Sequence, residues 1–141
     1  MAKPNPDAMM AAVSAVGVLL VDDQAPFRLA AKAVFRRLEE FEVVGEASSG
    51  EEAVSLASDL HPSLVLMDIN MPGISGIEAT RRIVSANPGV VVILCSTYEL
   101  ADLPTDATTS GAKAYVKKER FGAETLRCLW QHRDSDTFGS S

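Results

Sequence analysis

The sequence predicts an α/β fold in which a doubly wound parallel sheet has the strand order 2-1-3-4-5. Apolar runs suited to buried strands alternate with stretches of helical spacing, and the runs lie at residues 17–21, 43–47, 64–67, 90–95 and 114–116. These runs are continuous rather than alternating, as expected of strands covered on both faces in a parallel sheet. Because crossovers between parallel strands are right-handed, few topologies remain, and the order 2-1-3-4-5 is the leading one.

A helix is predicted after each apolar run. In residues 27–38, apolar side chains recur every three or four positions, which marks one face of a helix. The second helix follows the cap-like residues 48–50 and stops at His61, since the residue before a proline avoids the α region. The third helix follows Ser75, a reasonable N-cap, and the last covers residues 124–130.

The fourth helix, expected within residues 100–110, is the weakest element of the prediction. This segment contains three threonines, two aspartates and Pro104, all poor for a helix. Since proline is accepted only in the first helical turn, a helix should begin near Leu103 or Pro104, with Gly111 as its C-terminal cap. We expect a short or partly irregular helix, more mobile than the rest of the domain.

The chain has 141 residues, which is about one domain. We expect a flexible N-terminal extension at 1–16, one domain at 17–132 and a polar C-terminal tail at 133–141. The net charge of −6 argues against nucleic-acid binding by this segment, because phosphate contacts need clustered Lys and Arg. The mildly apolar residues 9–20 are too few to span a membrane. Two cysteines without a CxxC motif indicate a reducing, cytoplasmic setting.

Polar residues stand at the ends of the apolar runs, where burial alone would not favour them. Asp22 and Asp23 end the first strand, Asp68 the third and Ser96 the fourth, and Lys118 comes just after the fifth. In doubly wound sheets, ligands bind outside the carboxyl ends of the strands. Strands 1 and 3 are neighbours in the predicted order, so the three aspartates should converge at one end of the sheet.

Three adjacent carboxylates need a counter-charge. At an effective dielectric constant near 20, two charges about 4 Å apart repel by roughly 4 kcal/mol. Hard oxygen ligands around a small open site suit Mg²⁺, and phosphate oxygens would complete the coordination of the ion. Alternatively, Asp22 and Asp23 merely cap the helix that begins near Pro26. Asp68, at the end of a second strand, favours the Mg²⁺ site.

The remaining polar residues fit phosphoryl transfer, which needs mainly positioning and charge neutralisation. The Ser96 hydroxyl can donate to one phosphoryl oxygen and the Lys118 ammonium can pair with another, although a lone lysine can also be merely solvated. An aspartyl-phosphate phosphohydrolase is the competing enzyme, but it would carry an acid/base aspartate where this chain has Asn70. A flavodoxin-like cofactor binder would want a Ser/Thr/Gly-rich loop after the first strand, and residues 22–24 would instead repel phosphate.

Four motifs carry a resemblance to a known family: VDDQ at 21–24, LVLMDINMPGISGIE at 64–78, CSTY at 95–98 and GAKAYVKKE at 111–119. With these motifs the chain, from about 17 to 129, resembles the receiver domain of bacterial two-component response regulators. The resemblance implies a flavodoxin-like fold and a signalling role rather than an enzyme with turnover. It also implies a subfamily that often carries a C-terminal helix-turn-helix output domain, which does not follow here.

The resemblance also implies roles for individual residues. Asp68 would be the phosphoacceptor, and Mg²⁺ would be held by Asp22, Asp23, Asp68 and the backbone carbonyl of Asn70. Ser96 would be the switch hydroxyl, Tyr115 its aromatic partner and Lys118 the phosphate-contacting lysine.

The implied partners are a sensor histidine kinase or phosphotransfer protein, and a second copy or downstream protein. The latter would bind the face made of the fourth helix, the fifth strand and the fifth helix. Output would pass through protein contact or through a missing DNA-binding domain. One departure from the family is Glu119, where many receivers have proline, so no cis peptide bond is expected there.

Overall fold

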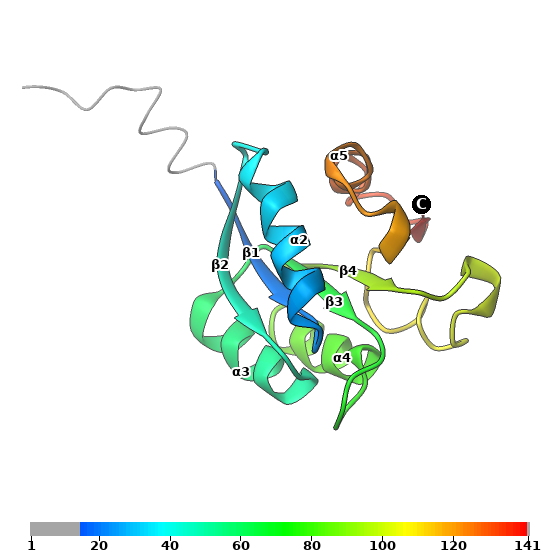
Figure 1. The fold of residues 1–141 in the computed structure, drawn as a ribbon. Coiled ribbons are helices and arrows are strands. Elements are labelled where there is room, and N and C mark those ends of the chain that lie inside the picture. Colours follow the sequence, from blue (N-terminus) through cyan, green and yellow to red (C-terminus); the bar gives the residue numbers. More distant parts are fainter. Residues whose placement is uncertain (1–14, 141) are drawn as a thin grey trace, which may run out of the picture.

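A six-stranded parallel sheet forms the centre of the protein. The computed structural model describes residues 15–140. The strand order is β2-β1-β3-β4-β5-β6, so the predicted order 2-1-3-4-5 is confirmed and a sixth strand is added (Figure 1). All neighbouring strands pair in parallel, and their bounds are β1 (Val16–Val21), β2 (Phe41–Ala47), β3 (Leu64–Asp68), β4 (Val91–Ser96), β5 (Ala114–Lys117) and β6 (Gly139–Ser140).

Helices cover both faces of this sheet. In Figure 1, α2 and α5 lie on one side and α3 and α4 on the other. The bounds are α2 (Ala25–Arg36), α3 (Gly50–Leu60), α4 (Gly76–Ala86) and α5 (Ala123–Gln131). Strand side chains alternate between two buried clusters, one shared with α2 and α5 and the other with α3 and α4. This double coverage explains why the strands read as continuous apolar runs.

The predicted helix boundaries at α3 and α4 are confirmed. Ser49 and Ser75 are the N-caps, and each hydroxyl accepts a hydrogen bond of 3.1 Å from the backbone N–H three residues later. Such caps contribute about 1 kcal/mol each. Helix α3 ends at Leu60, and His61 takes a left-handed conformation with φ 48° immediately before Pro62.

The fourth predicted helix is wrong as an α-helix. Between β4 and β5, all of whose linking residues are described, the helical structure is a single 3-10 turn, η1 (Leu100–Asp102). The expected start near Leu103 or Pro104 is also wrong, because Leu103 is extended with ψ 141°. A residue before proline is driven out of the α region, so the turn stops there. The expectation of an irregular segment is confirmed.

Local hydrogen bonds replace a helix in the second half of this segment. Ser110 Oγ donates to the Ala107 carbonyl at 2.6 Å and accepts from the Ala112 N–H at 3.2 Å. Serine side chains compete with the backbone in this way and favour turns. Gly111 has φ +100°, so it serves a turn rather than a helix cap.

The structure describes the two ends of the chain to different extents. Residues 1–14 of the predicted N-terminal extension lie outside the described part, and β1 begins at Val16. At the other end, Gly139 and Ser140 pair with Ala114 and Tyr115 as strand β6. A two-residue strand gives no periodicity in the sequence. Within residues 15–140, no helix is long and apolar enough to cross a membrane.

Candidate functional site

The strand register brings the predicted site residues to one end of the sheet. Val21 of β1 pairs with Met67 of β3, so the residues that follow them, Asp22 and Asp68, lie side by side. Asp68 in turn pairs with Cys95 of β4, one residue before Ser96. The expected convergence at the carboxyl ends of the strands is therefore confirmed.

Three carboxylates form a compact cluster at this end. Asp22, Asp23 and Asp68 each offer one oxygen, and these oxygens lie within 4.8 Å of one another. Asp22 and Asp68 are buried, whereas Asp23 is exposed and leaves the cluster open to solvent. Carboxylate oxygens in an open site of this kind fit a small hard cation such as Mg²⁺.

Lys118 supplies positive charge to this cluster. Its Nζ lies 2.7 Å from Asp22 Oδ2 and 3.8 Å from Asp68 Oδ2. The first pair is close but not aligned for a hydrogen bond, so Asp22 Oδ2 has an ionic partner and no hydrogen-bond donor among the described residues. A buried carboxylate oxygen in that position retains a lone pair for a cation.

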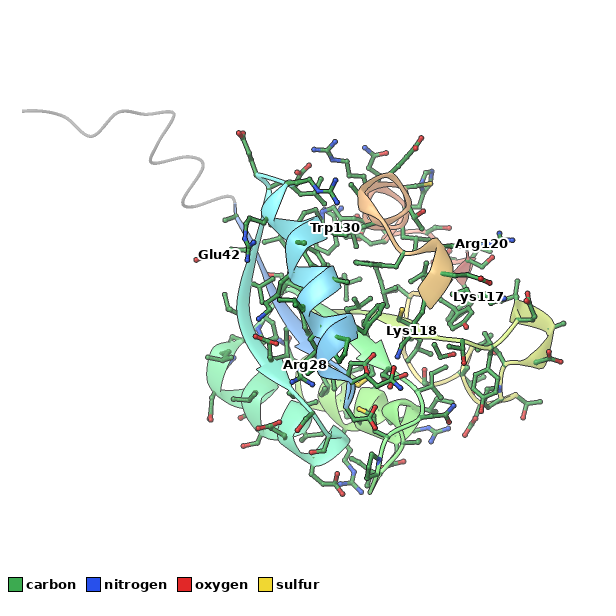
Figure 2. All side chains as sticks on the ribbon, viewed as in Figure 1. Arg28, Glu42, Lys117, Lys118, Arg120 and Trp130 are labelled. Carbon is green, nitrogen blue, oxygen red and sulfur yellow. The ribbon has the colours of Figure 1, made fainter. Side chains whose placement is uncertain are left out.

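The beginning of α2 surrounds Lys118 and Asp22. Lys118 Nζ lies 4.7 Å from the ring centroid of Phe27 and donates to Gln24 Oε1 at 3.4 Å. The Gln24 N–H donates to Asp22 Oδ1 at 2.8 Å, and Arg28 donates to the Asp22 carbonyl. Figure 2 places the Lys118 and Arg28 side chains near this end of α2. Asp22 therefore helps to orient the start of the helix, although the N-cap itself is Gln24 without a side-chain cap.

The electrostatics of the cluster centre on Asp68. Burial of the carboxyl group and the nearby charge of Asp22 raise the pKa of Asp68 from 3.8 to about 7, although Lys118 acts in the opposite direction. Burial tends to lower the pKa of Lys118, but its contacts with Asp22 and Asp68 outweigh burial and raise the pKa. The lysine is therefore charged at neutral pH, whereas Asp68 lies near its titration midpoint when no other cation is bound.

A second group of polar residues joins β4 to β5. The hydroxyls of Ser96 and Tyr115 lie 3.0 Å apart and are both buried. Tyr115 OH also lies 2.6 Å from the carbonyl of Tyr98 and 3.1 Å from that of Ser96. Burial raises the pKa of Tyr115, although its hydrogen bond with Ser96 acts in the opposite direction. The tyrosine is thus a neutral donor whose position depends on the residues just after β4.

Gly76 makes a backbone approach to Asp68 that no other residue could make. Its N–H donates to the Ile69 carbonyl at 2.8 Å, and a Cβ built at Gly76 would lie 1.8 Å from the Asp68 carbonyl oxygen. This glycine therefore lets the first turn of α4 pack directly against the end of β3.

Asn70 and Glu119 have contacts that the sequence did not indicate. The Asn70 side chain is exposed and Oδ1 accepts a hydrogen bond of 3.3 Å from Tyr98 OH. Glu119 forms an ion pair with Lys117, which also pairs with Glu99. A carboxylate at position 119 thus has a local partner where proline would offer none.

Sequence reasoning missed four contributors to this site. Gln24, Gly76 and Tyr98 lie within the four motifs without an assigned contact, and Phe27 belongs to the apolar positions of residues 27–38. The position of Gln24 beside two aspartates was a usable signal. The others depend on packing that sequence spacing does not encode.

Comparisons with known proteins agree with this geometry. A family model described as the response regulator receiver domain matches residues 18–128. The response regulator GacA of Pseudomonas aeruginosa is 38% identical over 116 residues, which are 82% of this chain and 54% of GacA. This chain therefore spans about half the length of the curated relatives it matches.

Solved structures give the same assignment of fold. A two-component response regulator of the LuxR family from Aurantimonas has a TM-score of 0.79 and 27% identity, covering 91% of this chain and 90% of that chain. A chain of the CheX-CheY-BeF3-Mg²⁺ complex from Borrelia burgdorferi has a TM-score of 0.74 and 28% identity, covering 82% and 87%. The family model covers most of the chain and the fold agrees, so this chain belongs to the response regulator receiver domain family.

Proposed function

We propose that this receiver domain accepts a phosphoryl group on Asp68 in a Mg²⁺-dependent reaction and thereby switches a partner-binding surface. The observation that carries the proposal is the position of Asp68, buried beside Asp22, Asp23 and Lys118. The similarity to a chain of the CheX-CheY-BeF3-Mg²⁺ complex supports it. The donor would be a sensor histidine kinase, a phosphotransfer protein or a small phosphodonor.

The carboxylate of Asp68 would act as the nucleophile. One of its oxygens attacks phosphorus in line, a new P–O bond forms, and the bond from phosphorus to the donor breaks, leaving the electron pair on the donor. Lys118 neutralises charge on the phosphoryl oxygens, which is the main contribution that phosphoryl transfer requires. Mg²⁺, held by Asp22, Asp23, Asp68 and the Asn70 carbonyl, would supply further neutralisation when bound.

The proposed switch begins at Ser96. Its hydroxyl would turn from Tyr115 and donate to the new phosphoryl group, biasing an equilibrium between two arrangements of the segment after β4. The Tyr115 ring is already buried in the described state, so the proposed switch does not require it to move into the interior. The face formed by residues 100–110, β5 and α5 would be read by a downstream protein or a second copy.

Phosphoryl loss is expected to be slow. Asn70 occupies the position where a phosphohydrolase of this kind would have an acid/base carboxylate, and its amide does not titrate. The chain would thus behave as a phosphoprotein and not as a multiple-turnover enzyme. A cytoplasmic location and an output through DNA binding in a longer protein stay predictions.

The test is phosphoryl uptake from acetyl phosphate with Mg²⁺, measured by intact-protein mass spectrometry. The wild type should gain one hydroxylamine-labile phosphoryl group, and Asp68→Asn should gain none. Asp59→Asn, on the exposed face of α3, is the matched control and should behave like the wild type. Uptake by Asp68→Asn at the wild-type rate would refute the assignment of the acceptor.

A further inference from the structure

The chain after α5 turns back toward the sheet through several specific contacts. The Arg133 guanidinium lies over the Trp130 ring, 4.2 Å from its centroid, and donates to the Trp130 carbonyl at 2.8 Å. The Ser135 N–H donates to the His132 carbonyl at 3.0 Å, and the Thr137 N–H donates to Ser135 Oγ at 3.2 Å. These contacts give residues 133–137 a defined path toward β5.

The end of this segment docks closely on β5. The Gly139 N–H donates to the Lys113 carbonyl at 2.9 Å, and Gly139 pairs with Ala114 in parallel register. A Cβ at Gly139 would lie 3.2 Å from Ala114 Cβ and 3.3 Å from Leu129 Cδ2, so a larger side chain would push the strand away. Phe138 packs against the buried cluster on the α3 and α4 side of the sheet.

Within the described residues, this short strand covers the first half of the β5 edge. It pairs with Ala114 and Tyr115, whereas β4 pairs with β5 as far as Lys117. Beside Ser140 lies a hollow of about 320 Å³, lined by Glu99, Leu100, Tyr115, Lys117, Arg120 and Ser140. Figure 2 shows Lys117 and Arg120 on the side of the molecule where the C-terminal strand lies. An unpaired strand edge readily pairs with another strand. The segment that covers the β5 edge therefore decides which strands can bind there.

The same edge is connected to the candidate site through Tyr115. The Tyr115 backbone pairs with Ser140, and its hydroxyl is bonded to Ser96 and to the Tyr98 carbonyl. The segment that follows Ser96 ends at Lys113, whose carbonyl accepts the Gly139 N–H. If the Ser96 hydroxyl turns away, Tyr115 loses a hydrogen bond. The segment between β4 and β5 is then held less firmly beside β6.

From these contacts we propose that residues 133–140, which end in the short strand β6, cover part of the β5 edge of their own chain and are released when Asp68 is phosphorylated. The strand covers part of the face through which output is proposed, so its release would uncover that edge. This inference rests on the proposed function of Asp68 and Ser96. The existence of the strand can be tested without it.

Tryptic cleavage after Arg133 in the full chain measures the release. In the wild type without beryllofluoride, cleavage should be slow because Arg133 is stacked on Trp130 and β6 is paired with β5. Adding beryllofluoride and Mg²⁺ should accelerate it at least about threefold, since cleavage follows the population of the open form. In Asp68→Asn the same additions should have no effect. The ¹⁹F resonance of bound beryllofluoride measures its binding to the protein separately from the cleavage.

Two variants test the strand itself. Gly139→Val should increase cleavage without beryllofluoride, because its side chain would collide with Ala114 and Leu129, and loading should add little. Asp136→Ala, at an exposed position of the same segment, should match the wild type. Wild-type cleavage in Gly139→Val would overturn the strand. A wild type that binds beryllofluoride without a change in cleavage would overturn the release of residues 133–140. A wild type that binds no beryllofluoride would overturn the proposed function and the release with it, while the Gly139→Val comparison still decides the strand.

Discussion

The ammonium of Lys118 lies closer to Asp22 than to Asp68: its Nζ is 2.7 Å from Asp22 Oδ2 and 3.8 Å from Asp68 Oδ2. The lysine therefore neutralises the carboxylate cluster without blocking the carboxylate proposed as nucleophile. It also competes with any cation for the oxygens of Asp22.

Replacing Lys118 should separate these two effects. In Lys118→Met, Mg²⁺ should bind about tenfold more tightly, which corresponds to about 1.4 kcal/mol, because no internal cation competes. Phosphoryl uptake should nevertheless fall at least tenfold, since charge neutralisation at phosphorus is lost. Calorimetric titration with Mg²⁺ and uptake from acetyl phosphate measure the two quantities. Lys113→Met, at an exposed position, is the control, and weaker Mg²⁺ binding in Lys118→Met would contradict the competition.

The raised pKa of Asp68 makes stability depend on pH in the absence of Mg²⁺. The folded chain holds a proton on Asp68 up to about pH 7, whereas the unfolded chain loses it near 3.8. The stabilisation by this proton is present below pH 3.8 and is lost as pH rises through 7. Asp68→Asn lacks this loss, so in EDTA it should be more stable than the wild type at pH 8 by up to about 4 kcal/mol.

That difference should stay nearly constant between pH 8 and 7 and should shrink as pH falls from 7 to 4. Denaturant unfolding at a series of pH values measures it, with Asp59→Asn as the matched control. A stability difference between Asp68→Asn and the wild type that does not change with pH would show that Asp68 titrates normally.

Asp23 should be needed for Mg²⁺ but not for folding. It is the exposed member of the cluster, so its removal leaves no buried group without a partner. In the wild type, Mg²⁺ at 100 times its Kd should stabilise the fold by about 2.7 kcal/mol, seen as a rise in Tm. Asp23→Ala should remain folded and lose this rise, while Asp59→Ala should keep it. An undiminished rise in Asp23→Ala would exclude the cluster as the metal site.

Gly76→Ala tests the backbone approach at Asp68. The added Cβ would lie 1.8 Å from the Asp68 carbonyl oxygen, so the start of α4 must move. We expect a loss of about 2–4 kcal/mol in the free energy of unfolding, together with slower phosphoryl uptake. Gly89→Ala is the control, because its Cβ would meet only Asn87 Oδ1 at 3.6 Å. Equal free energies of unfolding for the two variants would mean that the start of α4 moves without loss of stability.

The strand order and the carboxylate cluster could be predicted because each depends on a strong pattern. Continuous apolar runs mark parallel strands, and polar residues at their ends converge once the order is known. Ser49 and Ser75 were predictable as caps for a similarly local reason.

Other features depend on contacts between distant segments. Nothing local to Lys118 indicates that Asp22 is its nearest anion, and nothing in Gly139–Ser140 indicates a strand. The absence of an α-helix after β4 was only half predicted. The composition of residues 100–110 predicts a poor helix, but it does not show that the turn forms before Pro104 rather than after it.

The segment between β4 and β5 should be the least protected part of the sheet's connections. Its helical structure is confined to the short turn η1, with Leu100 exposed, and the remainder is held by turns and serine side chains. Backbone N–H groups in such structure open without unfolding the domain. We therefore expect amides 100–110 to exchange at least about tenfold faster than those of α2 in the unloaded protein.

Loading with beryllofluoride and Mg²⁺ should change this exchange, since the segment begins directly after Ser96 and its hydrogen bond to Tyr115. Hydrogen exchange followed by mass spectrometry, with α3 as an internal reference, measures both states. Tyr115→Phe should give faster exchange before loading, because the bonds of the hydroxyl to Ser96 and to the Tyr98 carbonyl are lost. Protection of residues 100–110 equal to that of α2, with and without beryllofluoride, would rule out their part in the switch.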